Sequence, residues 1–266
     1  MAMHAMSADT GPPLLPAWAT EFSSFGLLHA LTAGALIGAM VVSIVLGRRW
    51  LGTWRERALR GVWIGWTVVW QAWAVVWYLL PAQFDVAESL PLHLCDLAAW
   101  VAPLALLTQK RFLRTLLFFW GLGLSTQAFV TPVLSEGVTD VRFWLFWIGH
   151  TQIVGSAAYD LLVLRYRPTW RDYVLVTIVN VVIIGVMIPL NLLLDANYWY
   201  VGNLKPEHPT LIDRLGPWPL RVVWMLLIGQ GALAVLWGIG AWVGREVQAA
   251  AAEEGVATEI DARDGG

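Results

Sequence analysis

The sequence predicts an all-α, polytopic membrane protein with seven transmembrane helices, an external N-terminus and a cytoplasmic C-terminus. Of its 266 residues, 58% are hydrophobic and only 14% are charged, and the mean hydropathy is +0.61. That balance is typical of a membrane protein and excludes an ordinary soluble domain. Several uncharged apolar runs of about 20 residues support this prediction, because a helix of that length spans a hydrocarbon core of about 30 Å.

The seven expected spans alternate with short polar connections, and a longer connection, residues 195–219, precedes the last. Residues 1–24 form an extracytoplasmic tail, 25–243 the transmembrane domain, and 244–266 a polar tail that we expect to be disordered. No Lys or Arg occurs in the first twenty residues, so the basic region of a cleaved signal peptide is missing. The expected spans are 25–46, 61–80, 90–107, 112–130, 142–164, 173–194 and 220–243.

The distribution of basic residues sets the orientation. Thirteen Lys and Arg residues fall on one side of the expected membrane and four on the other, and the richer side is cytoplasmic by the positive-inside rule. We expect a multi-pass protein of the plasma (cytoplasmic) membrane. The richer side holds Arg48, Arg49, Arg55, Arg57, Arg60, Lys110, Arg111, Arg114, Arg165, Arg167, Arg171, Arg245 and Arg263, and the other holds Arg142, Lys205, Arg214 and Arg221.

Tryptophan is unusually frequent, with eighteen residues. Five of them recur every three or four residues and share one stripe of the second span. The stripe either lines a ligand cavity or packs against helices and lipid, and the second explanation is the commoner. Six others near span ends are expected as interfacial anchors. The stripe is Trp63, Trp66, Trp70, Trp73 and Trp77, and the anchors are Trp50, Trp54, Trp144, Trp147, Trp170 and Trp218.

Polar side chains gather in the outer half of the expected bundle. With a rise of about 1.5 Å per residue, Cys95 lies roughly 8 Å and His150 roughly 12 Å below the outer ends of their spans. The two side chains could therefore meet. Ionisable groups inside a membrane are functional candidates by default. The outer-layer residues are His93, Cys95, Asp96, Gln127, His150, Thr151, Gln152 and Asn191. In the inner half, Asp160 is expected to pair with Arg165.

Cys95 is a candidate nucleophile, with His150 as its base. His93 and Asp96 are three residues apart and can pair, whereas Cys95 points away from His93 in a regular helix. A helix N-terminus favours a thiolate, and oxyanion donors are expected from the N–H groups near Leu92 and His93, or from Gln127 and Asn191. Two alternatives stay open: Cys95 as a packed small hydrophobe, and the His93–Asp96 pair as a structural clamp.

Several other chemistries are excluded by the residue pattern. The two lysines, Lys110 and Lys205, lie outside the expected helices, so a retinal Schiff base has no attachment point. There is no HExxH motif, and His93, Cys95 and Asp96 are too poorly spaced for a zinc site. Without a glycine-rich phosphate loop, nucleotide-driven transport is not expected. We expect no cofactor, no metal and no nucleic-acid partner.

Four blocks of the sequence resemble a known family. They are Leu90-Pro-Leu-His-Leu-Cys95, Thr131-Pro132, Asn197-Tyr-Trp-Tyr200 with Lys205-Pro206, and Gly216-Pro-Trp-Pro219, and His150 adds to them. They look like the signatures of the bacterial YwaF-like integral membrane proteins, which look related to the transmembrane-protein-164 family. The resemblance covers roughly residues 60–240.

The resemblance implies cysteine-dependent acyl transfer on membrane phospholipids and lysophospholipids, with Cys95 as the nucleophile. The acyl group would pass through a thioester to a lysolipid or to water. Residues Asn197, Tyr198 and Tyr200 of the outer connection could cap the opening or form an interfacial aromatic belt. The alternative function is a small-solute transporter or sensor with an outer-facing polar cavity. Expected substrate-binding residues are Gln127, Thr151, Gln152, Asn191, Asn197, Tyr198 and Tyr200.

Overall fold

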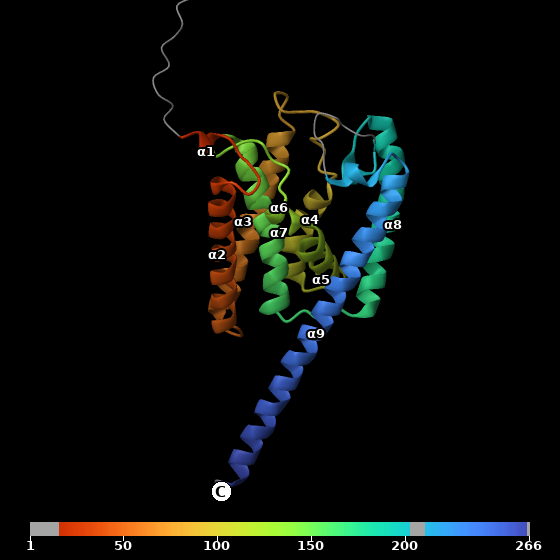
Figure 1. Ribbon diagram of the computed structural model, residues 1–266. Coiled ribbons are helices and arrows are strands. Elements are labelled where there is room, and N and C mark those ends of the chain that lie inside the picture. Colours follow the sequence, from red (N-terminus) through yellow and green to blue (C-terminus); the bar gives the residue numbers. More distant parts are fainter. Residues whose placement is uncertain (1–15, 203–210, 265–266) are drawn as a thin grey trace, which may run out of the picture.

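The long helices run alternately up and down in one bundle, with α1 at one end and the last residues of α9 at the other (Figure 1). This computed structural model describes residues 16–202 and 211–264, and these ranges contain no β-strand beyond an isolated bridge between Glu21 and Glu136. The helices are α1 Ala17–Thr20, α2 Leu27–Arg49, α3 Trp54–Tyr78, α4 Leu94–Thr108, α5 Arg111–Leu116, η1 Leu117–Leu124, α6 Gln127–Val130, α7 Val141–Leu162, α8 Trp170–Leu194, η2 Tyr198–Tyr200, η3 Leu211–Leu215 and α9 Leu220–Asp264.

Three helices within the described ranges are long and apolar enough to cross a membrane: α2, α8 and the Leu220–Trp242 part of α9. The chain is therefore a membrane protein. Helix α3 has 25 residues, but Arg55, Glu56, Arg57 and Arg60 make its first two turns strongly charged. Helix α4 is apolar but has only 15 residues. The total of seven spans and the orientation of the termini stay predictions.

The fourth expected span is broken into α5, the π-helical η1 and the single turn α6. Close helix packing accounts for this break. A Cβ at Gly121 would lie 2.7 Å from Cβ of Ala157 on α7, and one at Gly123 would lie 2.5 Å from Leu233 on α9. The wider π turn is a local rearrangement that periodicity in the sequence does not reveal.

Helix α9 continues past Val243, where the last span was expected to end, to Asp264 (Figure 1). The expected disordered tail is thus helical over residues 244–264. The run Ala249–Ala252 followed by Glu253 and Glu254 explains this, because Ala and Glu are strong helix formers. Residues 1–15 of the expected N-terminal tail, and Lys205 and Pro206 of the recognised blocks, lie outside the described residues.

The centre of the bundle is the contact between α4 and α7. Fully buried alanines on α4 let the two helices approach closely. Ala102 and Ala105 pack in one cluster with Ala157, and further down Leu106 packs with Tyr159 and Val163. Since both sets advance in the same direction along the chain, α4 and α7 are parallel neighbours.

The tryptophans divide between lipid-facing and packed positions. In the stripe on α3, Trp66 and Trp73 are exposed, and their rings lie 5.3 and 4.9 Å from the ring of Trp70. The Trp63 indole instead turns inward and donates a 2.9 Å hydrogen bond to Ser156. These contacts match the packing interpretation of the stripe. Trp147, expected as an interfacial anchor, is fully buried against Phe22, Leu28 and Phe143, because α1 folds over this end of α7.

Two ion pairs with buried carboxylates connect α5 to the C-terminal end of α7 and to the start of α8. Asp160 accepts hydrogen bonds of 2.9 and 3.0 Å from Arg114 and does not make the expected pair with Arg165. Helix α5 brings Arg114 to Asp160, whereas Arg165 is exposed beyond the end of α7. Asp172 pairs in the same way with Arg111 at the start of α8. These contacts tie α5 to α7 and α8.

Replacing Asp160 with alanine is expected to destabilise the fold by about 3 kcal/mol, because it leaves the Arg114 guanidinium buried without its partner. The measurement is unfolding in mixed micelles followed by circular dichroism. The matched control is Glu136→Ala, which breaks a partly exposed 3.4 Å pair with Arg142 and should change stability by less than about 1 kcal/mol. Equal effects of the two substitutions would contradict the structural role of Asp160.

Candidate functional site at the start of helix α4

The site is built on the first turn of α4. Pro91 disfavours a helical conformation of the residue before it, and the helix begins only at Leu94, with His93 as its N-cap. The Asp96 carboxylate accepts a 3.0 Å hydrogen bond from the His93 backbone N–H. The His93 imidazole packs on Tyr198 with ring centroids 4.8 Å apart. The contact described between His93 and Asp96 is therefore a helix cap, which matches the structural alternative for this pair.

Cys95 occupies the second position of the helix. The side chain is partly exposed and packs against the edge of the main apolar core. The Asp96 and Leu97 N–H groups donate to the His93 carbonyl at 3.1 and 3.2 Å, which leaves the N–H groups of Leu94 and Cys95 at the exposed start of the helix. Since the first N–H groups of a helix have no intrahelical partner and carry partial positive charge, they can stabilise a thiolate or an oxyanion.

His150 lies on α7, and one of its ring nitrogens has a backbone partner. Nδ1 is 2.7 Å from the Phe146 carbonyl oxygen, and the imidazole stacks on the Phe146 ring at 4.4 Å. A carbonyl only accepts, so Nδ1 carries the proton in this contact. In a neutral imidazole, Nε2 then has the lone pair and can act as a base.

The register of α4 and α7 puts Cys95 and His150 at the same level. Ala102 and Ala157 share one packing cluster. Cys95 comes seven residues before Ala102, and His150 comes seven residues before Ala157. Seven residues make about two helical turns, so each side chain lies on the same face of its helix as the corresponding alanine. Beside them, a Cβ at Gly149 would meet no heavy atom within 4 Å. The side of α7 that carries Gly149 is therefore not covered by another helix.

The two residues after His150 face other helices. Thr151 bonds to the Trp147 carbonyl at 2.7 Å and shares its stripe with Gly155, which packs on Met40 of α2. Gln152 shares its stripe with Ser156 and Tyr159, which bond to Trp63 and Glu56 of α3. Both Gln152 amide atoms are buried without a hydrogen-bond partner. His150 is thus the member of this trio that shares the Cys95 side of α7.

The expected oxyanion donors are engaged elsewhere or point outward. The Leu92 amide donates to the Leu90 carbonyl at 2.7 Å, and the His93 amide is the one that Asp96 accepts. Gln127 is exposed on α6. Asn191 is fully buried, but its side-chain amide makes two 2.8 Å bonds to the Tyr198 backbone. The N–H groups of Leu94 and Cys95, the first two residues of α4, are the better candidates.

The outer connection folds over the loop that precedes α4. Tyr198 is fully buried, and its hydroxyl donates to the Val86 carbonyl at 2.8 Å and accepts from the Leu90 amide at 3.2 Å. The Trp199 indole donates to the Leu92 carbonyl at 2.8 Å. Asn197 accepts from the Gly202 amide, and Tyr200 is partly exposed. Tyr198 and Trp199 are buried and brace the start of α4.

Tyr78 is a site residue that the sequence did not reveal. It ends α3, and its hydroxyl lies within electrostatic range of both Asp96 and Cys95. The same group is in range of Arg142 and Glu136 in the outer loop. Only the tryptophan stripe drew attention to this helix, and Tyr78 follows the last member of that stripe. It links the Cys95 site to the outer surface.

Two cavities frame the bundle. An open cleft of about 370 Å³ lies at the outer end, lined by Trp77, Gln83, Thr139, Asp140, Val141 and Arg142. A much narrower cleft lies near the opposite end, between α2, α3, α4 and α7. Neither is lined by Cys95 or His150, so the expected residues do not border these two clefts. Over residues 16–202 and 211–264, no three His, Cys, Asp or Glu side chains gather as metal ligands would.

Comparison with known proteins gives one match. A family model described as the TMEM164 family matches residues 24–241. That range includes the whole bundle and both helices of the Cys95 site, and it is longer than the 60–240 range of the resemblance. No curated protein and no solved structure matches the chain. The chain belongs to the TMEM164 family.

Proposed function

We propose that this member of the TMEM164 family is a cysteine-dependent acyltransferase that acts on membrane phospholipids. The observation that carries the proposal is the shared level of Cys95 and His150, each two turns from the Ala102–Ala157 cluster. A thiol needs a base to become a nucleophile at neutral pH. With Nδ1 on the Phe146 carbonyl, the Nε2 atom of His150 is the ring nitrogen left for that role.

The reaction has two balanced halves. His150 Nε2 takes the proton of the Cys95 thiol, and the thiolate attacks the carbonyl carbon of a phospholipid ester. A C–S bond forms, the ester C–O bond breaks, and the imidazolium returns the proton to the departing lysolipid oxygen. A lysolipid hydroxyl, or water, then gives its proton to His150 and attacks the thioester. The new C–O bond forms, the C–S bond breaks, and the imidazolium returns the proton to the departing Cys95 thiolate.

Backbone amides at the start of α4 stabilise the tetrahedral intermediate in this proposal. The Leu94 and Cys95 N–H groups occupy the first two positions of α4, whereas the Asp96 N–H donates to the His93 carbonyl at 3.1 Å. A carbonyl carbon bonded to the Cys95 sulfur would bring its oxygen close to the same end of the helix, where partial positive charge favours an oxyanion. Tyr198 and Trp199 hold the preceding loop in place from the outer connection.

The lipid ester reaches the site from the outer end of the bundle. The outer cleft borders Trp77, and Tyr78 beside it is in electrostatic range of Cys95. Arg142 in the same cleft is a cation at the level expected for phosphates of the outer leaflet. With the predicted orientation, the enzyme works on the outer leaflet of a bacterial inner membrane.

Intact-mass spectrometry tests the proposal directly. After incubation with phospholipid vesicles, the purified protein should gain the mass of one acyl chain, and neutral hydroxylamine should remove it because it cleaves thioesters. The Cys95→Ala variant should gain nothing. An adduct that Cys95→Ala retains, or its absence from a wild-type protein that still transfers acyl groups, would refute the cysteine mechanism.

A small-solute transporter or sensor is the second candidate function. The open outer cleft and the unpartnered, buried Gln152 favour it. This function predicts saturable binding of a polar solute that Gln152→Leu abolishes and Cys95→Ala leaves unchanged. The acyltransferase predicts the reverse dependence for acyl transfer, so the same two variants separate the candidates.

A further inference from the structure

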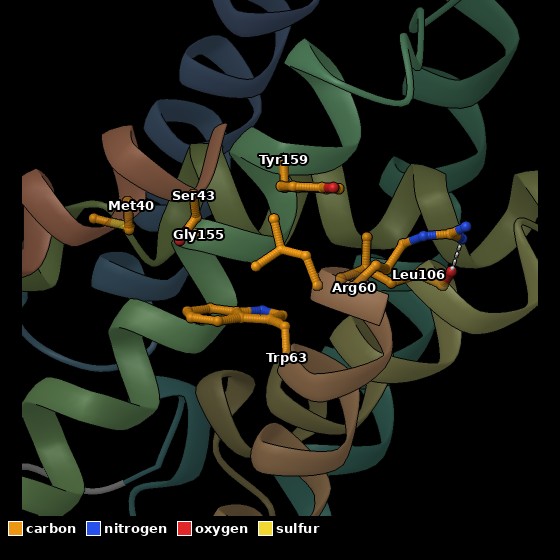
Figure 2. Close-up of a pocket in the computed structure, with 8 residues that line it drawn as sticks. Met40, Ser43, Arg60, Trp63, Leu106, Gly155 and Tyr159 are labelled. Carbon is orange, nitrogen blue, oxygen red and sulfur yellow. Dashed lines mark hydrogen bonds between the residues drawn. The ribbon is translucent and has the colours of Figure 1, made fainter. Parts of the chain in front are cut away.

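The narrow cleft at the end of the bundle away from Cys95 has a distinct composition. Its lining residues come from four helices and are almost entirely apolar in surface (Figure 2). Arg60 turns its guanidinium aside to the Leu106 carbonyl and to Glu56, and so presents its methylene stem to the cleft. The lining residues are Met40, Ser43, Leu59, Arg60, Trp63, Leu106, Gly155 and Tyr159. The cleft is a narrow groove between these helices and not a deep cavity.

Three arginines crowd together just beyond this cleft. Arg48 donates from Nε to the Leu162 carbonyl at 3.1 Å, and Arg167 donates to the Leu161 carbonyl at 2.9 Å. Burial, and then the positive charges of Arg165 and Arg48, lower the pKa of Arg167 below its usual value. Each guanidinium has five N–H donors. Carbonyls at the end of α7 therefore account for only part of the donors in this cluster.

Helix α2 joins the cleft to the arginines. Ser43, in the wall of the cleft, is five residues before Arg48, or about 7.5 Å along the helix axis. Between them, Gly47 packs so closely on Tyr159 that a Cβ would lie 2.5 Å from its ring. Tyr159 also lines the cleft. The apolar cleft therefore ends beside a cluster of positive charges. An anionic lipid would place its acyl chain along the first and its phosphate on the second.

Among the side chains that the structure describes, the acids near this cluster have other partners. Glu56 is buried and bonds to Arg60 and Tyr159, and Asp160 is buried against Arg114. Both carboxylates are committed to other partners. Like charges held together without a counterion are destabilising, and a phosphate that bridges them removes that repulsion.

We propose that this end of the protein binds one anionic phospholipid, with its phosphate on Arg48, Arg165 and Arg167 and one acyl chain in the cleft between α2, α3 and α7. The site lies at the opposite end of α7 from His150. It is separate from the proposed acyl transfer, and the bound lipid is not a substrate. Under the predicted orientation it is a lipid of the inner leaflet, whose anionic headgroups attract juxtamembrane arginines.

Native mass spectrometry of the full chain in detergent micelles tests this site. Phosphatidylglycerol should bind with a stoichiometry of one, more tightly than phosphatidylcholine with the same acyl chains. Arg165→Gln should weaken phosphatidylglycerol binding about fivefold, as expected for the loss of one arginine near a phosphate. The charge-matched control is Arg57→Gln, an exposed arginine of the same end outside the cluster, with less than a twofold effect.

Two further arms identify the ligand and its chain. Ser43→Leu fills the cleft and should weaken phosphatidylglycerol binding, whereas Cys95→Ala should leave it unchanged even if acyl transfer fails. Excess free glycerol phosphate should not displace the lipid, and displacement would make this a site for soluble anions. Equal binding of the two lipids, or equal effects of Arg165→Gln and Arg57→Gln, would overturn the proposal.

Discussion

Replacing Cys95 with serine is expected to lower the rate of phospholipid acyl transfer by about 1000-fold or more. A serine hydroxyl is a far weaker acid than a thiol, and His150 with its Nδ1 on a backbone carbonyl has no carboxylate to strengthen it as a base. The measurement is the initial rate of transfer from a labelled phospholipid to a lysolipid, with protein in vesicles.

The control for Cys95→Ser is Ala99→Ser, one turn further along the same stripe of α4. Ala99 is almost fully buried, so this change introduces the same hydroxyl into the same packed interface without touching the nucleophile. Its rate should stay within about threefold of the wild type, since a small polar substitution of this kind acts mainly on stability. Comparable losses in both variants would mean that packing, and not a nucleophile, explains the effect.

Replacing His150 with alanine is expected to lower the rate by about 100- to 10,000-fold, the range for loss of a general base. Because His150 is only partly buried, added imidazole should reach the vacated position and restore part of the activity. Rescue of this kind requires a proton-transfer role, since a merely structural histidine would not respond to a soluble base.

His29 is the matched control for His150. Like His150 it bonds to the backbone, with its ring 2.8 Å from the Phe25 amide and 3.0 Å from the Phe129 carbonyl, but it is buried and lies on α2. His29→Ala should lower stability and leave the rate per folded molecule unchanged, without imidazole rescue. A rescue of His29→Ala, or none for His150→Ala, would remove His150 from the mechanism.

Much of the helical architecture followed from periodicity, because long apolar runs in a membrane protein have few alternatives to a helix. The first, second, third, fifth and sixth expected spans correspond to α2, α3, α4, α7 and α8 within a few residues, apart from an earlier start of α3. The break around η1 was not predictable, because it depends on which residue Gly121 meets on another helix. The partner of Asp160 was missed for the same reason, since local spacing favoured Arg165 and the fold supplies Arg114.

The sequence predicted how deep the candidate side chains lie in the bundle, but not which neighbouring helices they face. Counting residues from the outer ends indicated that Cys95 and His150 share a layer, and the packing of Ala102 with Ala157 supports that level. The same count grouped them with Gln127, Thr151, Gln152 and Asn191, whose contacts lead to other neighbours. Rotational position depends on the surrounding helices, and Tyr78 enters the site only because α3 ends beside α4.

The helix cap also changes how the site is understood. Asp96 was expected as a partner of the His93 side chain, but its carboxylate accepts from the His93 amide and so fixes the first turn of α4. This leaves the cysteine at a helix start that is braced on one side by the cap and on the other by Tyr198 and Trp199. A rigid helix terminus is what an oxyanion site needs, because its donors must not reorganise during reaction.

Cross-linking measures the central claim most directly, namely that Cys95 and position 150 face each other across α4 and α7. Cys95 is the only cysteine of the chain, so each single cysteine substitution creates one possible pair. With a short bifunctional maleimide, His150→Cys should form an intramolecular link to Cys95, and Thr151→Cys, which faces α2, should not. Linking through position 151 but not through position 150 would contradict the account.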